Sequence, residues 1–354
     1  MRIRLAILES DAVYLNRLVS VFNVKYADKL EIYSFTDRDA AVQSLKVNKI
    51  DVFLANESFE IEETELSSNC GFAYLVDTTD IETVKGTAAI CKFQKAELIY
   101  RQILGIFSEK VAATTGVHLS DEDNCKVLAF VSAAGGTGSS VAAAACAMHF
   151  AQHGKKALYL NLERFGSADV FFHADGNTSL GDVIYAIKSK KGNLAMKLES
   201  TVKQDASGVF FYSSTNMALD IAELSPGEIQ QIISVLKMSG AYDYLILDLD
   251  FSMDKKLLSV LEECNTIVFV ADGSQVSNVK LERVIASLSI IEEQSDMKLL
   301  MRSGILYNRF SSQTSRKVNL AGLKEYGGIS RYEGFDTQKL LQQLKSQQVF
   351  DTLE

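Results

Sequence analysis

The chain has 354 residues, a formal net charge of −9 and a single proline. A chain of this length is expected to form two domains, each with its own core. The acidic charge provides no basic field for nucleic acid, and no run approaches the 18 uninterrupted apolar residues of a membrane span. Five scattered cysteines without a C-x-x-C pair are typical of reduced thiols. These features predict a cytoplasmic protein with no integral membrane segment and no nucleic-acid partner.

The first 110 residues alternate strand-like and helix-like patterns. We expect strands over Ile3–Leu8, Leu30–Phe35, Ile50–Ala55, Phe72–Val76 and Ala88–Cys91, and helices over Asp11–Phe22, Asp39–Lys46 and about Lys95–Lys110. Five βα repeats in this length predict a doubly wound parallel sheet. Residues 111–126 are polar, turn-rich and aperiodic, so they are interpreted as a linker between domains at 1–110 and 127–354.

Charged residues follow the first and last of these strands. Glu9 and Asp11 come after the first strand, and Lys92 comes after the fifth. In this arrangement the domain resembles the receiver domain of two-component response regulators. The resemblance places Asn56 at the phosphoacceptor position, and an amide cannot form an acyl phosphate. We therefore expect an atypical receiver-like domain without phosphotransfer. The alternative is a flavodoxin-like fold with no relation to receivers, which also predicts no phosphotransfer.

A glycine-rich turn over 132–138 joins an apolar run over 127–131 to an alanine-rich segment over 141–150. Such a junction brings backbone N–H groups and a helix N-terminus together around an anion. The candidate phosphate ligands are Gly135, Gly136, Thr137, Gly138, Ser139, Ser140 and Val141. A P-loop reads G-x-x-x-x-G-K-[ST], so Ser140 keeps the hydroxyl while Ser139 replaces the lysine. The simpler alternative is a flexible turn.

A second set of strands follows the loop. We expect them over Lys156–Leu162, Val209–Tyr212, Tyr244–Leu249, Thr266–Val270 and Gly304–Tyr307. Ser225-Pro-Gly-Glu228 predicts a helix start with a capping box. The last amphipathic segment, Thr337–Leu353, is expected to dock on its own sheet.

His149 and His153 share a helix face, but no further metal ligand is evident and Gly154 ends the helix, so they are interpreted as helix-end residues.

In the order and spacing of its motifs, the second half resembles the MinD/ParA superfamily of deviant-Walker ATPases. The family loop reads S-G-K-G-G-V-G-K-T-T, and Ala134 and Ser139 replace its two lysines. The resemblance implies ATP and Mg²⁺ as cofactors and a homodimer across the nucleotide site. It implies metal contacts from Ser140 and Asp248, nucleotide contacts from Asn308 and Arg309, and Glu163 as the candidate that orients the attacking water. The alternative role for Asn308 is that of a strand-end turn residue.

The missing lysines weaken catalysis more than binding. Loss of one charged hydrogen bond, about 1.5–3 kcal/mol, lowers affinity roughly 10- to 150-fold, whereas a cation supplied in trans is worth about 10³–10⁵ in rate. We therefore expect ATP binding with little or no hydrolysis. Arg164 and Arg309 are the candidates to replace the lost charge.

The overall expectation is α/β, with two doubly wound parallel-sheet domains, the first receiver/flavodoxin-like and the second P-loop MinD/ParA-like. This layout resembles the TadZ/CpaE family, which localises the machinery of tight-adherence (Flp-type) pili. The resemblance implies a positioning scaffold whose partners include pilus and secretion components such as the secretion ATPase, concentrated at the cell pole or inner membrane through them. An active partition ATPase and a nucleotide-free interaction scaffold are the alternatives.

Overall fold

The computed structural model describes residues 2–67, 70–81, 83–110, 125–190, 193–320 and 322–354. The chain divides into two compact units, one formed by 1–116 with 186–201 and the other by 117–185 with 202–354. Residues 111–124 of the expected linker lie outside the described residues, and Lys126 already begins a strand. The boundaries proposed from the sequence differ from this division chiefly in the segment 186–201.

Unit 1 contains a six-stranded sheet in the order β2-β1-β3-β4-β6-β5. Its strands are β1 (Ile3–Leu8), β2 (Leu30–Phe35), β3 (Val52–Asn56), β4 (Gly71–Val76), β5 (Thr83–Val84) and β6 (Thr87–Cys91). All pair in parallel except β5, which is antiparallel to β6. The order of the parallel strands is that of flavodoxin-like folds. The expected doubly wound sheet is therefore confirmed.

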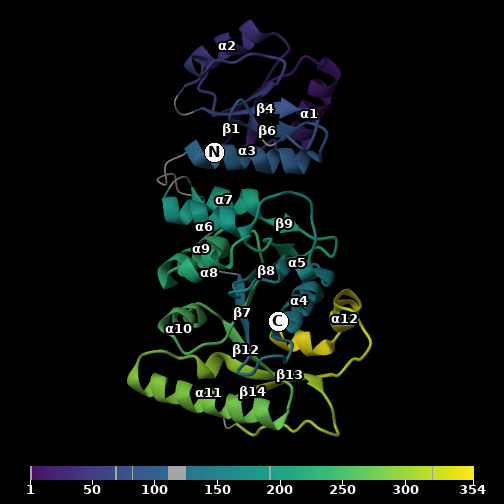
Figure 1. Cartoon of the computed structure of the whole chain (residues 1–354), viewed down its shortest axis with the longest axis vertical. Coiled ribbons are helices and arrows are strands. Elements are labelled where there is room, and N and C mark those ends of the chain that lie inside the picture. Colours follow the sequence, from purple (N-terminus) through teal and green to yellow (C-terminus); the bar gives the residue numbers. More distant parts are fainter. Residues whose placement is uncertain (1, 68–69, 82, 111–124, 191–192, 321) are drawn as a thin grey trace. The chain divides into compact units, whose positions relative to one another are not determined.

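Helices cover both faces of this sheet. The helices α1 (Ala12–Lys25) and α3 (Ala96–Lys110) pack on one face, and α2 (Arg38–Val47) packs on the other (Figure 1). The expectation of five βα repeats is wrong in one respect. Within the described residues, a short 3₁₀ turn, η1 (Glu63–Glu65), follows β3, and the β5 hairpin follows β4. The first connection packs Phe59, Ile61 and Leu66 on the core without the spacing of a helix, and the second carries few apolar residues.

A later segment of the chain completes unit 1. The helix α7 (Leu194–Thr201) packs on α3, and Met196 contacts the core under α1 and α3. The Asn193 backbone N–H donates to the carbonyl oxygen of Ser108 at 3.2 Å, and Lys29 pairs with Glu199. The sequence does not predict that α7 packs on unit 1, because this helix has the ordinary amphipathic spacing of any surface helix.

Unit 2 contains an eight-stranded sheet in the order β14-β13-β12-β7-β11-β8-β10-β9. The strands are β7 (Lys126–Val131), β8 (Ala157–Asn161), β9 (Lys203–Gln204), β10 (Phe210–Phe211), β11 (Tyr244–Asp248), β12 (Thr266–Ala271), β13 (Ser303–Phe310) and β14 (Lys324–Ser330). Among the described strands only β9 pairs antiparallel. The five expected strands are confirmed, and β9 and β14 are additions.

The helix α4 (Ser139–Gln152) lies in the core of unit 2. Every residue from Ala142 to Phe150 is buried, since small alanine side chains allow close approach to the sheet. Around it on the same face lie α5 (Ala168–Phe171), α12 (Thr337–Leu344) and η3 (Gln348–Leu353), while α9 (Pro226–Met238) and α10 (Lys255–Glu262) lie on the other face (Figure 1). The remaining helical elements are α6 (Leu180–Ser189), α8 (Ala218–Glu223), α11 (Gln275–Gln294) and η2 (Leu300–Arg302).

Two local predictions for this unit are confirmed. Ser225 and Glu228 form the capping box at the start of α9. The last amphipathic segment docks on its own core through Leu341, Leu344, Phe350 and Leu353. None of the helices in the described part of the chain has the length and apolar character required to cross a membrane.

Candidate functional site

The candidate site of unit 2 lies where parallel strands end and their connections begin, the usual location of ligand sites in such sheets. The loop between β7 and α4 is built on two glycines in the left-handed region, Gly136 at φ 80° and Gly138 at φ 82°. Gly138 is the N-cap of α4 and supplies no side-chain cap. The first N–H groups of a helix have no intrahelical partner. The loop therefore presents uncapped amides at residues 139–141.

The end of β13 braces this loop. Asn308 donates through Nδ2 to the carbonyl oxygens of Thr137 at 2.9 Å and Gly138 at 3.3 Å. Arg309 donates through Nη1 to the carbonyl oxygen of Gly136 at 2.7 Å. A Cβ on Gly138 would lie 2.5 Å from Asn308 Nδ2, so position 138 requires glycine for space as well as for φ. Contact of Asn308 with a nucleotide base stays a prediction, because here its amide is committed to the loop.

A cluster of hydrogen-bonded side chains connects the start of α4 to the ends of β8 and β11. Ser140 donates through Oγ to Glu163 Oε1 at 3.0 Å, and Glu163 Oε2 accepts from Asn161 Nδ2 and Ser167 Oγ, both at 2.9 Å. Asp248 Oδ2 accepts from Tyr159 at 2.7 Å and from Asn161 at 3.0 Å. Asn161 thus bridges the two carboxylates.

Asp248 is fully buried, and its Oδ1 has no hydrogen-bond partner among the described residues; the same holds for the buried Oγ of Ser139. Burial, together with the charge of Glu163, raises the pKa of Asp248 to about 8, although hydrogen bonds from Tyr159 and Asn161 oppose the shift. A buried carboxylate oxygen beside a second carboxylate and a hydroxyl is the oxygen-rich donor set that Mg²⁺ uses. Ser140, Asp248 and Glu163 therefore fit an Mg²⁺ site.

Of the two arginines considered for the missing lysines, only Arg309 contacts the loop. The backbone N–H of Arg164 donates to Asp250 Oδ2 at 2.8 Å, and its side chain lines a cavity of about 310 Å³. The cavity walls come from the segments after β8 and β11 and from α8, α9 and α10, with no residue of the glycine loop. Lys256, Asp250 and Asp254 give this cavity a charged rim.

Sequence reasoning missed Tyr159 and Ser167. Tyr159 lies two residues before Asn161 on β8, so the two side chains point to the same face of the sheet. The alternation of side chains along a strand could therefore have predicted that Tyr159 lies beside Asn161. Ser167 follows Glu163 by four residues in a connection of irregular backbone, where no periodicity predicts a contact.

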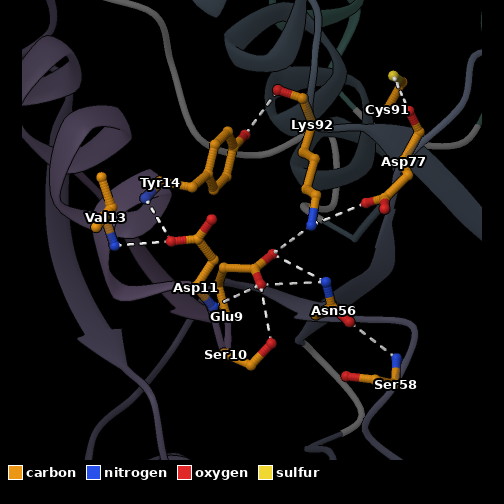
Figure 2. Close-up of polar contacts among 10 residues, drawn as sticks. All are labelled: Glu9, Ser10, Asp11, Val13, Tyr14, Asn56, Ser58, Asp77, Cys91 and Lys92. Atoms are coloured by element: carbon orange, nitrogen blue, oxygen red, sulfur yellow. Dashed lines mark hydrogen bonds and ion pairs between the residues drawn. The ribbon is translucent and has the colours of Figure 1, made fainter.

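The corresponding edge of unit 1 carries a closed polar network (Figure 2). Glu9 is fully buried and accepts from Asn56 Nδ2 at 3.2 and 3.0 Å. Lys92 Nζ lies 3.5 Å from Glu9 Oε2 and 2.8 Å from Asp77 Oδ1. Asp11 instead caps α1, accepting from the N–H groups of Val13 and Tyr14. Every carboxylate of this group already has a partner.

The charge balance of this network depends on Lys92. Burial alone would lower the pKa of Lys92, but the hydrogen bond to Asp77 and the negative charge of Glu9 outweigh it, so its pKa is raised. Lys92 therefore stays charged and compensates the buried Glu9. Asp77, directly after β4, is a member of this site that sequence analysis missed, because its position became meaningful only once β4 and β6 were paired.

Comparison with known proteins finds a family model for part of the chain and solved structures of similar fold. Residues 1–108 match the family model of the TadZ-like receiver domain. The structure of a ParA family ATPase from Chlorobium tepidum TLS is similar at 24% sequence identity, covering 65% of this chain and 96% of that chain, with a TM-score of 0.52. MinD from Pyrococcus horikoshii OT3 in complex with Mg-ADP matches at 18% identity over 65% of this chain and 94% of that chain, with a TM-score of 0.48. No curated protein sequence matches.

These findings define a two-domain α/β protein in which a receiver-like domain is joined to a fold of the ParA ATPase type. The first of these domains is similar to the TadZ-like receiver domain over residues 1–108, and the likeness to the ParA family ATPase is one of fold.

The closed network of unit 1 leads to a prediction about phosphorylation. Incubation of the full chain with acetyl phosphate and Mg²⁺ should leave residues 1–110 unmodified, because Asn56 offers an amide at the acceptor position and its Nδ2 is bound to Glu9. Intact-mass and peptide mass spectrometry measure this, with a phosphorylatable receiver domain as the positive control. A stoichiometric phosphate adduct in this region would contradict the prediction.

The raised pKa of Asp248 predicts a pH dependence of stability in metal-free protein. Between its ordinary value of 3.8 and about 8 the folded state holds a proton that the unfolded state releases. The contribution of Asp248 to stability therefore falls as the pH rises through this window. Asp248→Asn cannot ionise and should lack this slope, and Glu163→Gln should reduce it.

Urea unfolding followed by circular dichroism in a chelating buffer at pH 5 and pH 8 measures the difference between each variant and the wild type. Using the difference removes the contributions of other titrating groups. Equal slopes in the wild type and Asp248→Asn would show that burial does not shift this carboxyl.

Proposed function

We propose that this protein binds Mg·ATP at the Gly135–Val141 loop and acts as a dimeric positioning scaffold for a tight-adherence (Flp-type) pilus secretion machine, with little or no ATP hydrolysis. The observation that carries the nucleotide part is the uncapped start of α4 directly beside the buried carboxylate of Asp248. The receiver-domain match carries the pilus part.

The loop has space and donors for phosphate. A Cβ placed on Gly135 or Gly136 would meet no atom within 4 Å, so the backbone at these positions is open to a ligand. Amides of 138–141 and the Ser139 hydroxyl supply donors, while Ser140 and Asp248 hold Mg²⁺. The metal supplies the positive charge that the loop lacks without its lysine. Arg309, already bound to the Gly136 carbonyl, adds the remaining charge from the protein.

Weak hydrolysis follows from the surroundings of Glu163. Its two carboxylate oxygens accept hydrogen bonds from Ser140, Asn161 and Ser167. A carboxylate occupied in this way is poorly placed to orient a water molecule. The lysine that would act in trans is replaced by Ala134, which is 7% exposed. A loss of transition-state charge of this kind is worth about 10³–10⁵ in rate.

The scaffold role uses both units. The polar network of the receiver-like domain is neutralised internally, so this domain serves as a docking module for pilus and secretion components such as the secretion ATPase. Phe165 lies two residues after Glu163 and is 81% exposed, which supplies an apolar contact for a homodimer across the nucleotide sites. Concentration at the cell pole or inner membrane then comes from the partners.

One observation favours the nucleotide-free scaffold as second candidate. The loop carbonyls of Gly136, Thr137 and Gly138 already accept hydrogen bonds from Arg309 and Asn308, so the loop is held in shape by the protein alone. The same bracing is compatible with a preformed phosphate cradle. Direct measurement of binding separates the two.

Calorimetric titration of the full chain with Mg·ATP should show binding that depends on the loop and the metal. Asp248→Asn should abolish the Mg²⁺-dependent part, and Arg309→Gln should weaken binding about tenfold through loss of one exposed charged contact. Arg283→Gln is the matched control, since Arg283 is an exposed arginine on α11. The absence of both heat and thermal shift at millimolar Mg·ATP would leave the nucleotide-free scaffold as the function.

The dimer and the slow turnover are tested together. Light scattering with Mg·ATP should show a homodimer, which Phe165→Ser should weaken while Met301→Ser, a comparably exposed residue at 79%, should not. Phosphate release should stay below about 1 s⁻¹, the lower end of typical enzyme rates. A strict monomer under all conditions, or faster turnover, would refute the scaffold and favour an active partition ATPase.

A further inference from the structure

Three side chains of types that can bind metal ions lie together at the C-terminal end of α4, the end opposite the glycine loop. His149 is buried near the end of the helix, His153 is its exposed C-cap residue, and Asp351 is exposed in η3. One ligand atom from each lies within 4.8 Å of the others. The histidine pair was visible in the sequence, but the third ligand comes from a position 202 residues after His149.

The tautomers of both histidines are set by backbone carbonyls. His149 Nδ1 lies 2.8 Å from the carbonyl oxygen of Lys345, and His153 Nδ1 lies 2.8 Å from the carbonyl oxygen of His149. Because a carbonyl oxygen only accepts, each Nδ1 carries the hydrogen, and a neutral ring then has its lone pair on Nε2. A backbone carbonyl on the second ring nitrogen is the usual way in which proteins orient metal-binding histidines.

This tautomer creates a conflict at His149. Its Nε2 lies 2.8 Å from Asp351 Oδ1, so the lone pair of a neutral ring faces the lone pairs of a carboxylate. Only a cation between or on these atoms, a proton or a metal ion, makes the contact favourable. The ring cannot turn away easily, since it is buried and packs at 5.6 Å from the ring of Phe350.

The spacing is compatible with a metal ion. Bonds of about 2.1 Å in tetrahedral geometry hold two ligand atoms about 3.4 Å apart, so the Asp351 carboxylate would have to withdraw by about 0.6 Å from its present 2.8 Å contact. That is a small movement for a side chain that is 53% exposed. His153 is exposed and its Nε2 is available for coordination.

We propose that His149, His153 and Asp351 form a binding site for a transition-metal ion of the Zn²⁺ class, with a fourth position open to water. Two imidazoles and one carboxylate suit Zn²⁺, whereas Mg²⁺ and Ca²⁺ prefer oxygen ligands throughout. The site is thus chemically distinct from the oxygen-rich group around Asp248. It joins the end of α4 to η3, so metal binding stabilises the docking of the last segment of the chain.

Titration of the tag-free full chain with Zn²⁺ against a chromophoric chelator tests this, and Co²⁺ provides a visible absorption band that reports coordination. We expect one equivalent to bind and the melting temperature to rise with Zn²⁺. The site variants are His153→Gln and Asp351→Asn, both at exposed positions, so that the core packing of His149 is kept. Each should weaken binding at least tenfold, the lower end of the loss seen for residues that only support ligands.

His173→Gln and Asp296→Asn are the matched controls, an exposed histidine and an exposed aspartate outside the cluster. They should leave Zn²⁺ affinity unchanged. All five cysteines are buried, so surface thiols do not compete for the metal. Circular dichroism of metal-free variants confirms that they fold.

Two results would overturn the proposal. One is equal loss of affinity in control and site variants, which indicates adventitious binding. The other is no Zn²⁺ binding together with a doubly protonated His149 ring in the NMR spectrum, which shows that a proton alone occupies the contact with Asp351. Neither result depends on whether the loop at the other end of α4 binds ATP.

Discussion

The burial of α4 against the sheet of unit 2 is the constraint on which both candidate sites depend. Nine consecutive residues of this helix are buried, and alanine side chains make the close packing possible without voids. With its axis held in this way, the start of the helix is directed at the carboxyl edge, where Asp248 and Glu163 lie. Its other end brings His149 against η3. A helix that packed more loosely would leave the glycine loop and the histidine cluster without fixed partners.

In both units, the buried carboxylates at the candidate sites are stabilised by neighbouring polar or charged side chains. A buried carboxylate left without a partner is strongly destabilising. In unit 1, Lys92 and Asn56 satisfy Glu9. In unit 2, Asn161 stands between Asp248 and Glu163 and donates to both. In unit 2 the amide of Asn161 lies where two acidic groups would otherwise repel each other, and in unit 1 the ammonium group of Lys92 lies between Glu9 and Asp77. Such a network is stable without phosphoryl transfer or hydrolysis, which agrees with the scaffold role proposed above.

Much of the fold was predictable from residue patterns. The strands of unit 1, the strand, loop and helix around Gly138, and the capping box of α9 follow from local periodicity and turn chemistry. The added strand β14 was missed because its adjacent glycines interrupt the apolar alternation. The hairpin at β5 and the turn at η1 stand where five βα repeats would have required helices, because neither connection has the apolar spacing of a helix. The placement of 186–201 in unit 1 depends on packing that no local pattern encodes.

The sequence by itself determined most of the strands and helices, the glycine loop and the absence of lysine at positions 134 and 139, because these are properties of neighbouring residues. Only the tertiary structure decided which distant groups meet: Asn308 on the loop carbonyls, Asn161 between two carboxylates, Asp77 on Lys92 and Asp351 beside His149. It also decided the pKa of Asp248, since burial and a neighbouring charge exist only after the strands have packed. The physical reason is that backbone periodicity is set locally, whereas hydrogen-bond partners and desolvation are set by how separate elements pack.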